Sequence, residues 1–105
     1  MPAYVIATID VDDEAAAMAY APVAAESVIR HGGRYLVATP VPEPVEGSWE
    51  SGRLVVIEFP DLERIHTWYD SPEYRRAREI REGGVRLGLL FVEGSPPEGF
   101  QPPAE

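Results

Sequence analysis

A single carboxylate within an apolar run is the first candidate for chemistry. Glu58 interrupts the stretch from Leu54 to Phe59, whose β-branched and aromatic residues are typical of a strand. A carboxylate in a half-buried strand must be paired, hydrated or protonated, so Glu58 could act as a general base or bind a ligand in a cleft. The alternative is a structural salt bridge to an arginine, or an exposed edge position, because ion-pair networks also place carboxylates in strands.

His66 is the second candidate for a catalytic role. It falls at the flank of the sheet-facing side of a predicted helix, where an imidazole could move a proton near neutral pH. An ordinary helix-surface histidine is the favoured alternative. The other histidine, His31, follows the first predicted helix and is expected to help cap its negative end. Two histidines far apart in the sequence make no metal-ligand pattern, and we expect neither a metal nor a cofactor.

Three candidates for ligand binding lie in or near loops and helix ends. Arg53 could clamp a carboxylate or phosphate with its planar fork, but an ion pair with Glu46 that fixes the loop base is favoured. Trp49, in a loop rich in glycine and proline, is expected to insert into a partner subunit or to cap a cavity. Arg81 lies close to the inner face of the last helix and is a possible partner for Glu58.

Five further candidates come from the first strand and the helix junction. Tyr4, Thr8 and Asp10 share the face of the first strand that carries polar groups, so they could line a cleft. Asp10 could instead simply cap the first helix. For Trp68 and Tyr74, packing in the core is favoured over an aromatic cage around a ligand.

Seven predicted elements position these residues. Gly-Gly pairs, Pro60 and the N-cap residue Ser71 followed by Pro72 mark their ends. Pro22 should kink the first helix or divide it in two. The expected strands are Ala3–Val11, Arg34–Thr39, Arg53–Phe59 and Val85–Val92; the expected helices run from the acidic residues at 12–14 to Gly32, from Asp61 to Tyr69, and from Pro72 to about Glu82.

The order of elements predicts a fold. A βαββαβ order favours an α+β, ferredoxin-like sandwich, a four-stranded antiparallel sheet with its helices on one face. The other face would be bare and apolar, so a second subunit or a ligand should cover it. Two such sheets facing each other would form a barrel-like homodimer. The long loop at 40–52 should cover a site or reach the neighbouring subunit.

Composition limits the classes of function. The 105 residues suit one domain over 1–94, followed by a loose tail rich in Pro, Gly and Glu at 95–105. A net charge of −9 argues against nucleic acid and anionic membrane surfaces as partners. The chain has no cysteine and no lysine, which excludes thiolate and Schiff-base chemistry. The start, MPAYVIATIDV, lacks the pattern of a signal peptide, so we expect a cytoplasmic protein.

Several blocks carry a resemblance to a known family. GGRYLV at 32–37, EGSW at 46–49, RLVVIEFP at 53–60, WYDSPEY at 68–74 and FVEG at 91–94 resemble the domain-of-unknown-function 1330 (DUF1330) family of the dimeric α/β-barrel superfamily. The resemblance implies a homodimer whose two sheets form a barrel, and it implies no established reaction. The chain departs from the family at 38–40, where it reads Ala-Thr-Pro and members often have an arginine and two glycines.

Two functions remain open from the sequence. The first is a homodimer that binds a small molecule in a cavity between sheet and helices, as a cofactor-free enzyme that uses Glu58 or His66 for acid–base chemistry. The second is a non-catalytic ligand-binding or assembly module whose bare sheet face is only a dimer interface. A cavity that contains Glu58 with an arginine or a tyrosine would favour the first function, and a cavity with no titratable group would favour the second.

Overall fold

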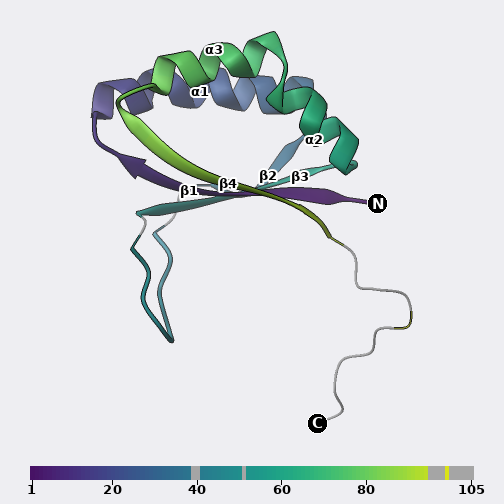
Figure 1. Cartoon of the computed structure of the whole chain (residues 1–105), viewed down its shortest axis with the longest axis horizontal. Helices are drawn as coiled ribbons and strands as arrows, with labels where there is room; N and C mark the ends of the chain where they lie inside the picture. Colours follow the sequence, from purple (N-terminus) through teal and green to yellow (C-terminus); the bar gives the residue numbers. More distant parts are fainter. Residues whose placement is uncertain (39–40, 51, 95–98, 100–105) are drawn as a thin grey trace.

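The computed structural model describes residues 1–38, 41–50, 52–94 and 99, and contains a four-stranded sheet with three helices on one face (Figure 1). The elements are β1 (Ala3–Val11), α1 (Glu14–Arg30), β2 (Arg34–Ala38), β3 (Arg53–Phe59), α2 (Leu62–Tyr69), α3 (Pro72–Arg81) and β4 (Val85–Glu93). They agree with the predicted elements to within a residue or two. The predicted tail, apart from Gly99, and the predicted strand end at Thr39 lie outside the described residues.

The sheet has the order β2-β3-β1-β4 with every neighbouring pair antiparallel, which confirms the predicted ferredoxin-like α+β fold. Residues directly opposite each other on antiparallel strands share a face of the sheet. In this register Ile6 lies opposite Val56 on one side and Leu90 on the other. Alternate residues of β1 therefore belong to two different surfaces, one facing the helices and one facing away from them.

The helices begin where the sequence supplies side-chain caps. The carboxylate of Asp13 accepts a hydrogen bond from Ala15 N at 3.0 Å, and that of Asp61 accepts one from Arg64 N at 2.7 Å. Ser71 caps α3 in the same way, with proline at the first helical position as expected.

Helix α1 is continuous from Glu14 to Arg30, so Pro22 does not divide it in two. Proline removes one helical hydrogen bond and frees the carbonyl four residues earlier. Here Pro22 and Met18, which carries that carbonyl, are both exposed, so water can satisfy the freed group.

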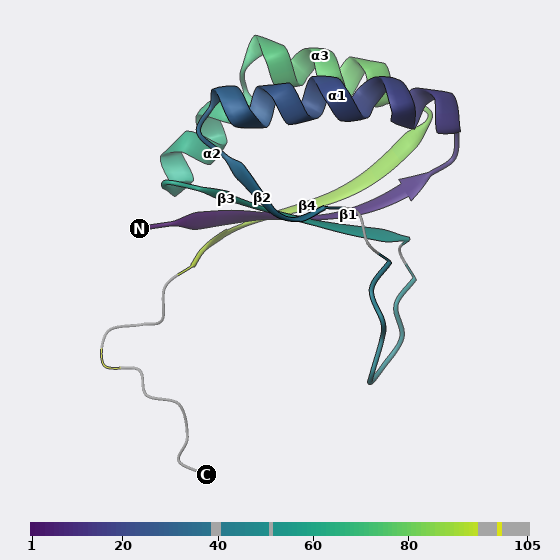
Figure 2. The ribbon, with the colours of Figure 1, turned by 180° about the vertical axis from the view of Figure 1, so that it is seen from behind.

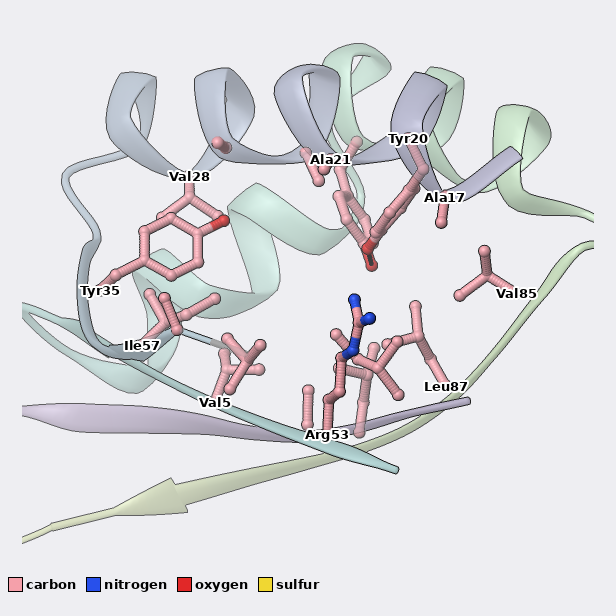
Figure 3. Close-up of a pocket in the computed structure, with 18 of the residues that line it drawn as sticks. Val5, Ala17, Tyr20, Ala21, Val28, Tyr35, Arg53, Ile57, Val85 and Leu87 are labelled. Atoms are coloured by element: carbon pink, nitrogen blue, oxygen red, sulfur yellow. Dashed lines mark hydrogen bonds between the residues drawn. The ribbon is translucent and has the colours of Figure 1, made fainter. Parts of the chain in front are cut away.

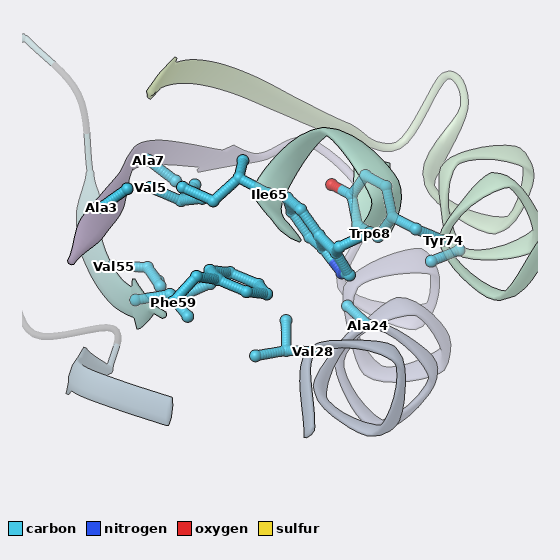
Figure 4. Close-up of a cluster of buried hydrophobic side chains, with 12 residues drawn as sticks. Ala3, Val5, Ala7, Ala24, Val28, Val55, Phe59, Ile65, Trp68 and Tyr74 are labelled. Carbon is cyan, nitrogen blue, oxygen red and sulfur yellow. The ribbon is translucent and has the colours of Figure 1, made fainter. Parts of the chain in front are cut away.

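The core lies between the sheet and the helices and centres on Trp68 (Figure 4). The Trp68 ring is 2% exposed and packs against Tyr74 and Phe59, with ring centroids 4.3 and 5.4 Å away. Its Nε1 donates to Ser27 Oγ at 3.0 Å, and this hydroxyl donates to the carbonyl of Ala24 at 2.7 Å. The buried indole N–H is therefore satisfied, as a core tryptophan requires.

Among the described residues, no helix lies on the opposite face of the sheet (Figures 1 and 2). We call it the open face; it carries the apolar side chains of Ile6, Val37, Leu54, Val56, Leu90 and Val92. Leu90 is 63% exposed and Val92 43% exposed. Among the described residues, no helix has the length and apolar character that a membrane crossing needs.

A projecting segment, residues 41–50, connects β2 and β3, and we call it the arm. It extends from the sheet on the side of the open face, away from the helices (Figures 1 and 2). Three of its apolar side chains are exposed: Val41, Val45 and Trp49.

Candidate functional site

A cavity of about 440 Å³ lies between the helix-facing side of the sheet and helices α1 and α3 (Figure 3). It exists because α1 presents alanines to the sheet, and methyl groups leave space where larger side chains would fill it. Its volume falls within the range of about 300–1,000 Å³ that is typical of small-molecule sites. The residues that line the cavity include Val5, Ala17, Tyr20, Tyr35, Ala38, Arg53, Trp68 and Tyr74.

Tyrosine hydroxyls and one guanidinium supply the polar groups of this cavity. The hydroxyls of Tyr20 and Tyr74 form a hydrogen bond of 2.9 Å that ties α1 to α3. Figure 3 shows the guanidinium of Arg53 rising from the sheet into the cavity, toward the hydroxyl of Tyr20, and the ring of Tyr35 lying at the other end. The remainder of the wall is almost entirely aliphatic or aromatic.

Burial favours the neutral form of two cavity tyrosines, Tyr20 and Tyr35. It raises the pKa of Tyr35 to about 12, and it raises the pKa of Tyr20 further. The neighbouring Tyr74 hydroxyl adds to both shifts. A phenol with a raised pKa is a hydrogen-bond donor at neutral pH and not a base, so these hydroxyls can orient a ligand but cannot remove its proton.

The raised pKa of Tyr35 predicts a loss of stability at alkaline pH. Folding favours the neutral phenol, so its stabilising contribution is complete below the unfolded pKa of about 10 and is lost as pH rises toward 12. Titration of tyrosinate absorbance should therefore show Tyr20 and Tyr35 ionising only together with the loss of circular dichroism. Ionisation of Tyr20 and Tyr35 near pH 10 in the folded protein would contradict this prediction.

Glu58 lies on the open face and not in the cavity. Its carboxylate accepts a hydrogen bond from Arg34 Nε at 2.8 Å and one from the Tyr4 hydroxyl at 3.2 Å. The structure thus contains the salt bridge that was the alternative to a catalytic Glu58. The expected pairing with Arg81 is not formed, because Arg81 lies on the other side of the sheet, beside the Tyr20 ring.

Thr8 and Asp10 also lie on the open face, because they alternate with the cavity residues of β1. The carboxylate of Asp10 accepts a hydrogen bond from Gly52 N at 2.8 Å, which fixes the base of the arm. Asp10 therefore does not cap the first helix, a role that Asp13 fills. The face with polar groups, which we expected to line a cleft, lies on the other side of the sheet from the cavity.

The histidines also lie outside the cavity. His66 is exposed on α2, with its ring edge to face with Phe91 at a centroid distance of 5.6 Å. His31 occupies the C-cap position of α1 as predicted, and its Nε2 lies 3.9 Å from a carboxylate oxygen of Glu73. No cluster of three metal-ligating side chains occurs in the part of the chain that the structure describes.

Of the candidate residues, the structure brings Arg53, Trp68 and Tyr74 together around the cavity. Arg53 points into it, and no ion pair between Arg53 and Glu46 is found among the described residues. Trp49 is 39% exposed on the arm, on the opposite side of the sheet. An arm on that side does not cap the cavity.

Sequence reasoning missed Tyr20 and Tyr35. The sequence did contain a signal for Tyr20, because it is the one large side chain with a polar end in the alanine-rich stretch at 15–21. Ala38, where the chain departs from the pattern of the family, also lines the cavity. Members of the family often carry an arginine at this point.

The strand order and the helical layer define a ferredoxin-like α+β protein with an apolar helix-side cavity. The chain belongs to the DUF1330 family: the model of this family, described as "Domain of unknown function (DUF1330)", matches residues 2–95. This confirms the resemblance seen in the sequence. No curated protein matches the chain.

Solved structures show the same fold. A protein of unknown function from Rhodopseudomonas palustris, RPA0582, superposes with a TM-score of 0.73 at 17% identity, over 91% of this chain and 84% of that one. A dimeric ferredoxin-like protein of unknown function from Jannaschia sp. CCS1 gives 0.65 at 13% identity, over 90% and 100%. SnoaB, a cofactor-independent oxygenase from Streptomyces nogalater, gives 0.62 at 10% identity, over 94% and 98%. At these identities the likeness concerns the fold alone.

Proposed function

We propose that this protein is a homodimer that binds an apolar small molecule in the cavity between its sheet and its helices. The observation that carries the proposal is the cavity itself, about 440 Å³ in volume, with an apolar wall and a few polar groups that converge on it. A cavity of this character is the usual form of a small-molecule site.

The composition of the wall favours binding over acid–base catalysis. The titratable side chains that line the cavity are Arg53 and three tyrosines, and none of these residue types normally titrates near neutral pH. Glu58 and His66 could supply a base only from outside the cavity, and Glu58 is held by Arg34 on the open face. This distribution supports a ligand-binding protein, the second of the two functions left open by the sequence.

The open face supports the homodimer. An isolated chain would expose Leu90 and Val92 beside Ile6 and Val56, and contiguous apolar surface of this kind marks an interaction site. The Jannaschia protein with the same fold is dimeric. A second copy would place two equivalent open faces against each other about a two-fold axis, as expected for a symmetric dimer.

The direction of the arm supports contact with the partner subunit. It extends on the side where the second copy would lie, and it carries exposed Val45 and Trp49 (Figure 1). Each subunit would then bury the arm's apolar side chains against the other. Tryptophan is enriched at the centres of such interfaces because it buries a large area.

Native mass spectrometry of gently purified protein tests both parts of the proposal. We expect a dimer, with a retained small molecule on part of the population. A monomer at micromolar concentration would contradict the homodimer. Retained ligand is not required for the cavity proposal, because a weakly bound molecule leaves during purification, so binding is tested separately.

Filling the cavity should weaken the binding of an apolar probe. Ala17→Phe places a ring from α1 into the space, and we expect at least a tenfold loss of affinity for the neutral dye N-phenyl-1-naphthylamine. Fluorescence titration measures it. Ala19→Phe is the matched control, because Ala19 is exposed on the same helix and does not line the cavity. Equal dye affinity in both variants would place the dye elsewhere and count against the cavity as the binding site.

A further inference from the structure

We propose that the ligand of the cavity is an apolar molecule that ends in a single carboxylate, which Arg53 binds at the cavity mouth. This inference rests on the proposed function and names the chemical class of its ligand. Three features support it: an arginine with no carboxylate partner among the described residues, a pair of hydrogen-bonded tyrosine hydroxyls, and an apolar wall.

Arg53 differs from the other two arginines of the sheet. Arg34 and Arg86 each have a carboxylate of the chain at 2.8 Å, from Glu58 and Asp12 respectively. Within the described residues, no carboxylate lies within ion-pairing distance of Arg53. Its guanidinium instead points into the cavity (Figure 3). The guanidinium of an arginine is planar and can donate two parallel hydrogen bonds to one carboxylate. A carboxylate of the ligand would therefore be a suitable partner for Arg53.

The tyrosine pair leaves one donor for the ligand. The hydroxyls of Tyr20 and Tyr74 hold two hydrogens between them, and their mutual bond of 2.9 Å uses one. The second hydrogen needs an acceptor, and none is found among the described residues. Because the guanidinium of Arg53 points toward Tyr20, a ligand oxygen bound there can accept from both groups (Figure 3).

The other residues of the cavity indicate the chemistry of the rest of the ligand. Arg53 is exposed and stands at the mouth, while Val5 and Trp68, buried residues of the wall, lie deeper. The charged end of the ligand would keep contact with water, and its apolar part would lie inside, which avoids the cost of burying a charge. Arg53 is the only charged residue among the described residues that line the cavity, so the wall itself supplies a single cation. This favours a monocarboxylate over a phosphate or a dicarboxylate.

Displacement of N-phenyl-1-naphthylamine by decanoate and by decan-1-ol tests the inference, since the two compounds share a chain and differ in charge. We expect the wild-type protein to bind decanoate about tenfold to a hundredfold more tightly, as a charge-assisted hydrogen-bond pair predicts. Arg53→Met should remove this preference, because the affinity for decanoate should fall far more than the affinity for decan-1-ol. Arg53→Lys, which keeps the charge but loses the fork, should retain part of it.

Arg75→Met is the matched control, because Arg75 is an exposed arginine of α3 that does not line the cavity, and it should keep the full preference. Circular dichroism confirms that each variant is folded. Equal affinity for the two compounds in the wild type, or a preference that survives in Arg53→Met, would overturn the inference and leave the proposed function intact. Failure of the dye and of both compounds to bind the wild-type cavity would overturn the proposed function and the inference together.

Discussion

Leu90→Glu is expected to convert the dimer into monomers. Leu90 lies on the open face in the edge strand β4, opposite Ile6 of β1, and is 63% exposed in the single chain. In the proposed dimer the substitution would place a carboxylate in the apolar interface, once from each subunit. An uncompensated buried charge costs about 3–5 kcal/mol, and a cost of this size raises a dissociation constant at least about a hundredfold.

Ile29→Glu is the matched control for this prediction. Ile29 is 66% exposed, close to the exposure of Leu90, but it lies on α1 and not on the open face. Sedimentation velocity over a range of concentrations should therefore show a dimer for Ile29→Glu and a monomer for Leu90→Glu. A Leu90→Glu protein that remains dimeric would show that the second copy binds elsewhere. A dimer lost in both variants would point to net charge rather than to the open face.

Trp68→Ala is expected to remove a large share of the stability of the domain. The substitution deletes a ring that packs on Phe59 and Tyr74, and it leaves Ser27 without its indole donor. Truncation of a buried tryptophan costs about 3–5 kcal/mol, against a total stability of about 5–15 kcal/mol for a typical domain. Because Trp68 also borders the cavity, the void that remains would join an existing space.

Chemical denaturation in the Leu90→Glu background measures this loss without a contribution from dimer dissociation. Trp49→Ala is the control, since the chain has two tryptophans and Trp49 lies on the arm. We expect Trp49→Ala to change the free energy of unfolding by less than about 0.5 kcal/mol, as for most surface substitutions. A small loss for Trp68→Ala would mean that the helices pack more loosely against the sheet than the structure indicates.

The fold could be predicted from the sequence because the signals for its elements are local. Strong end signals surround each strand and helix, such as Ser71-Pro72 before α3 and the glycines after α1 and α3. Alternation in β1 also separated the apolar face, which packs against the helices, from the face that carries Tyr4. These features depend on a few neighbouring residues, so no tertiary information was needed.

The site was harder to predict because a cavity forms where small side chains leave space unfilled. The polar side chains of β1 and β3 drew attention to the open face, whereas the cavity formed behind it, where the alanines of α1 leave space. Tyr35 and Ala38 both line the cavity although strict alternation would separate them. A bulge between Tyr35 and Val37 shifts the register of β2 on β3 and brings Ala38 to the same side. Bulges of this kind have no clear sequence signal.

The alternation along β1 has an evolutionary consequence. Val5, Ala7 and Ile9 face the cavity, while Tyr4, Ile6 and Thr8 face away from it, so neighbouring codons contribute to different surfaces. A substitution at an odd position can change the fit of the ligand while leaving the surface offered to the second copy as it was, and the reverse holds for even positions. Ligand preference and partner choice can therefore diverge separately among descendants. A single inserted codon within this strand would exchange both surfaces at once.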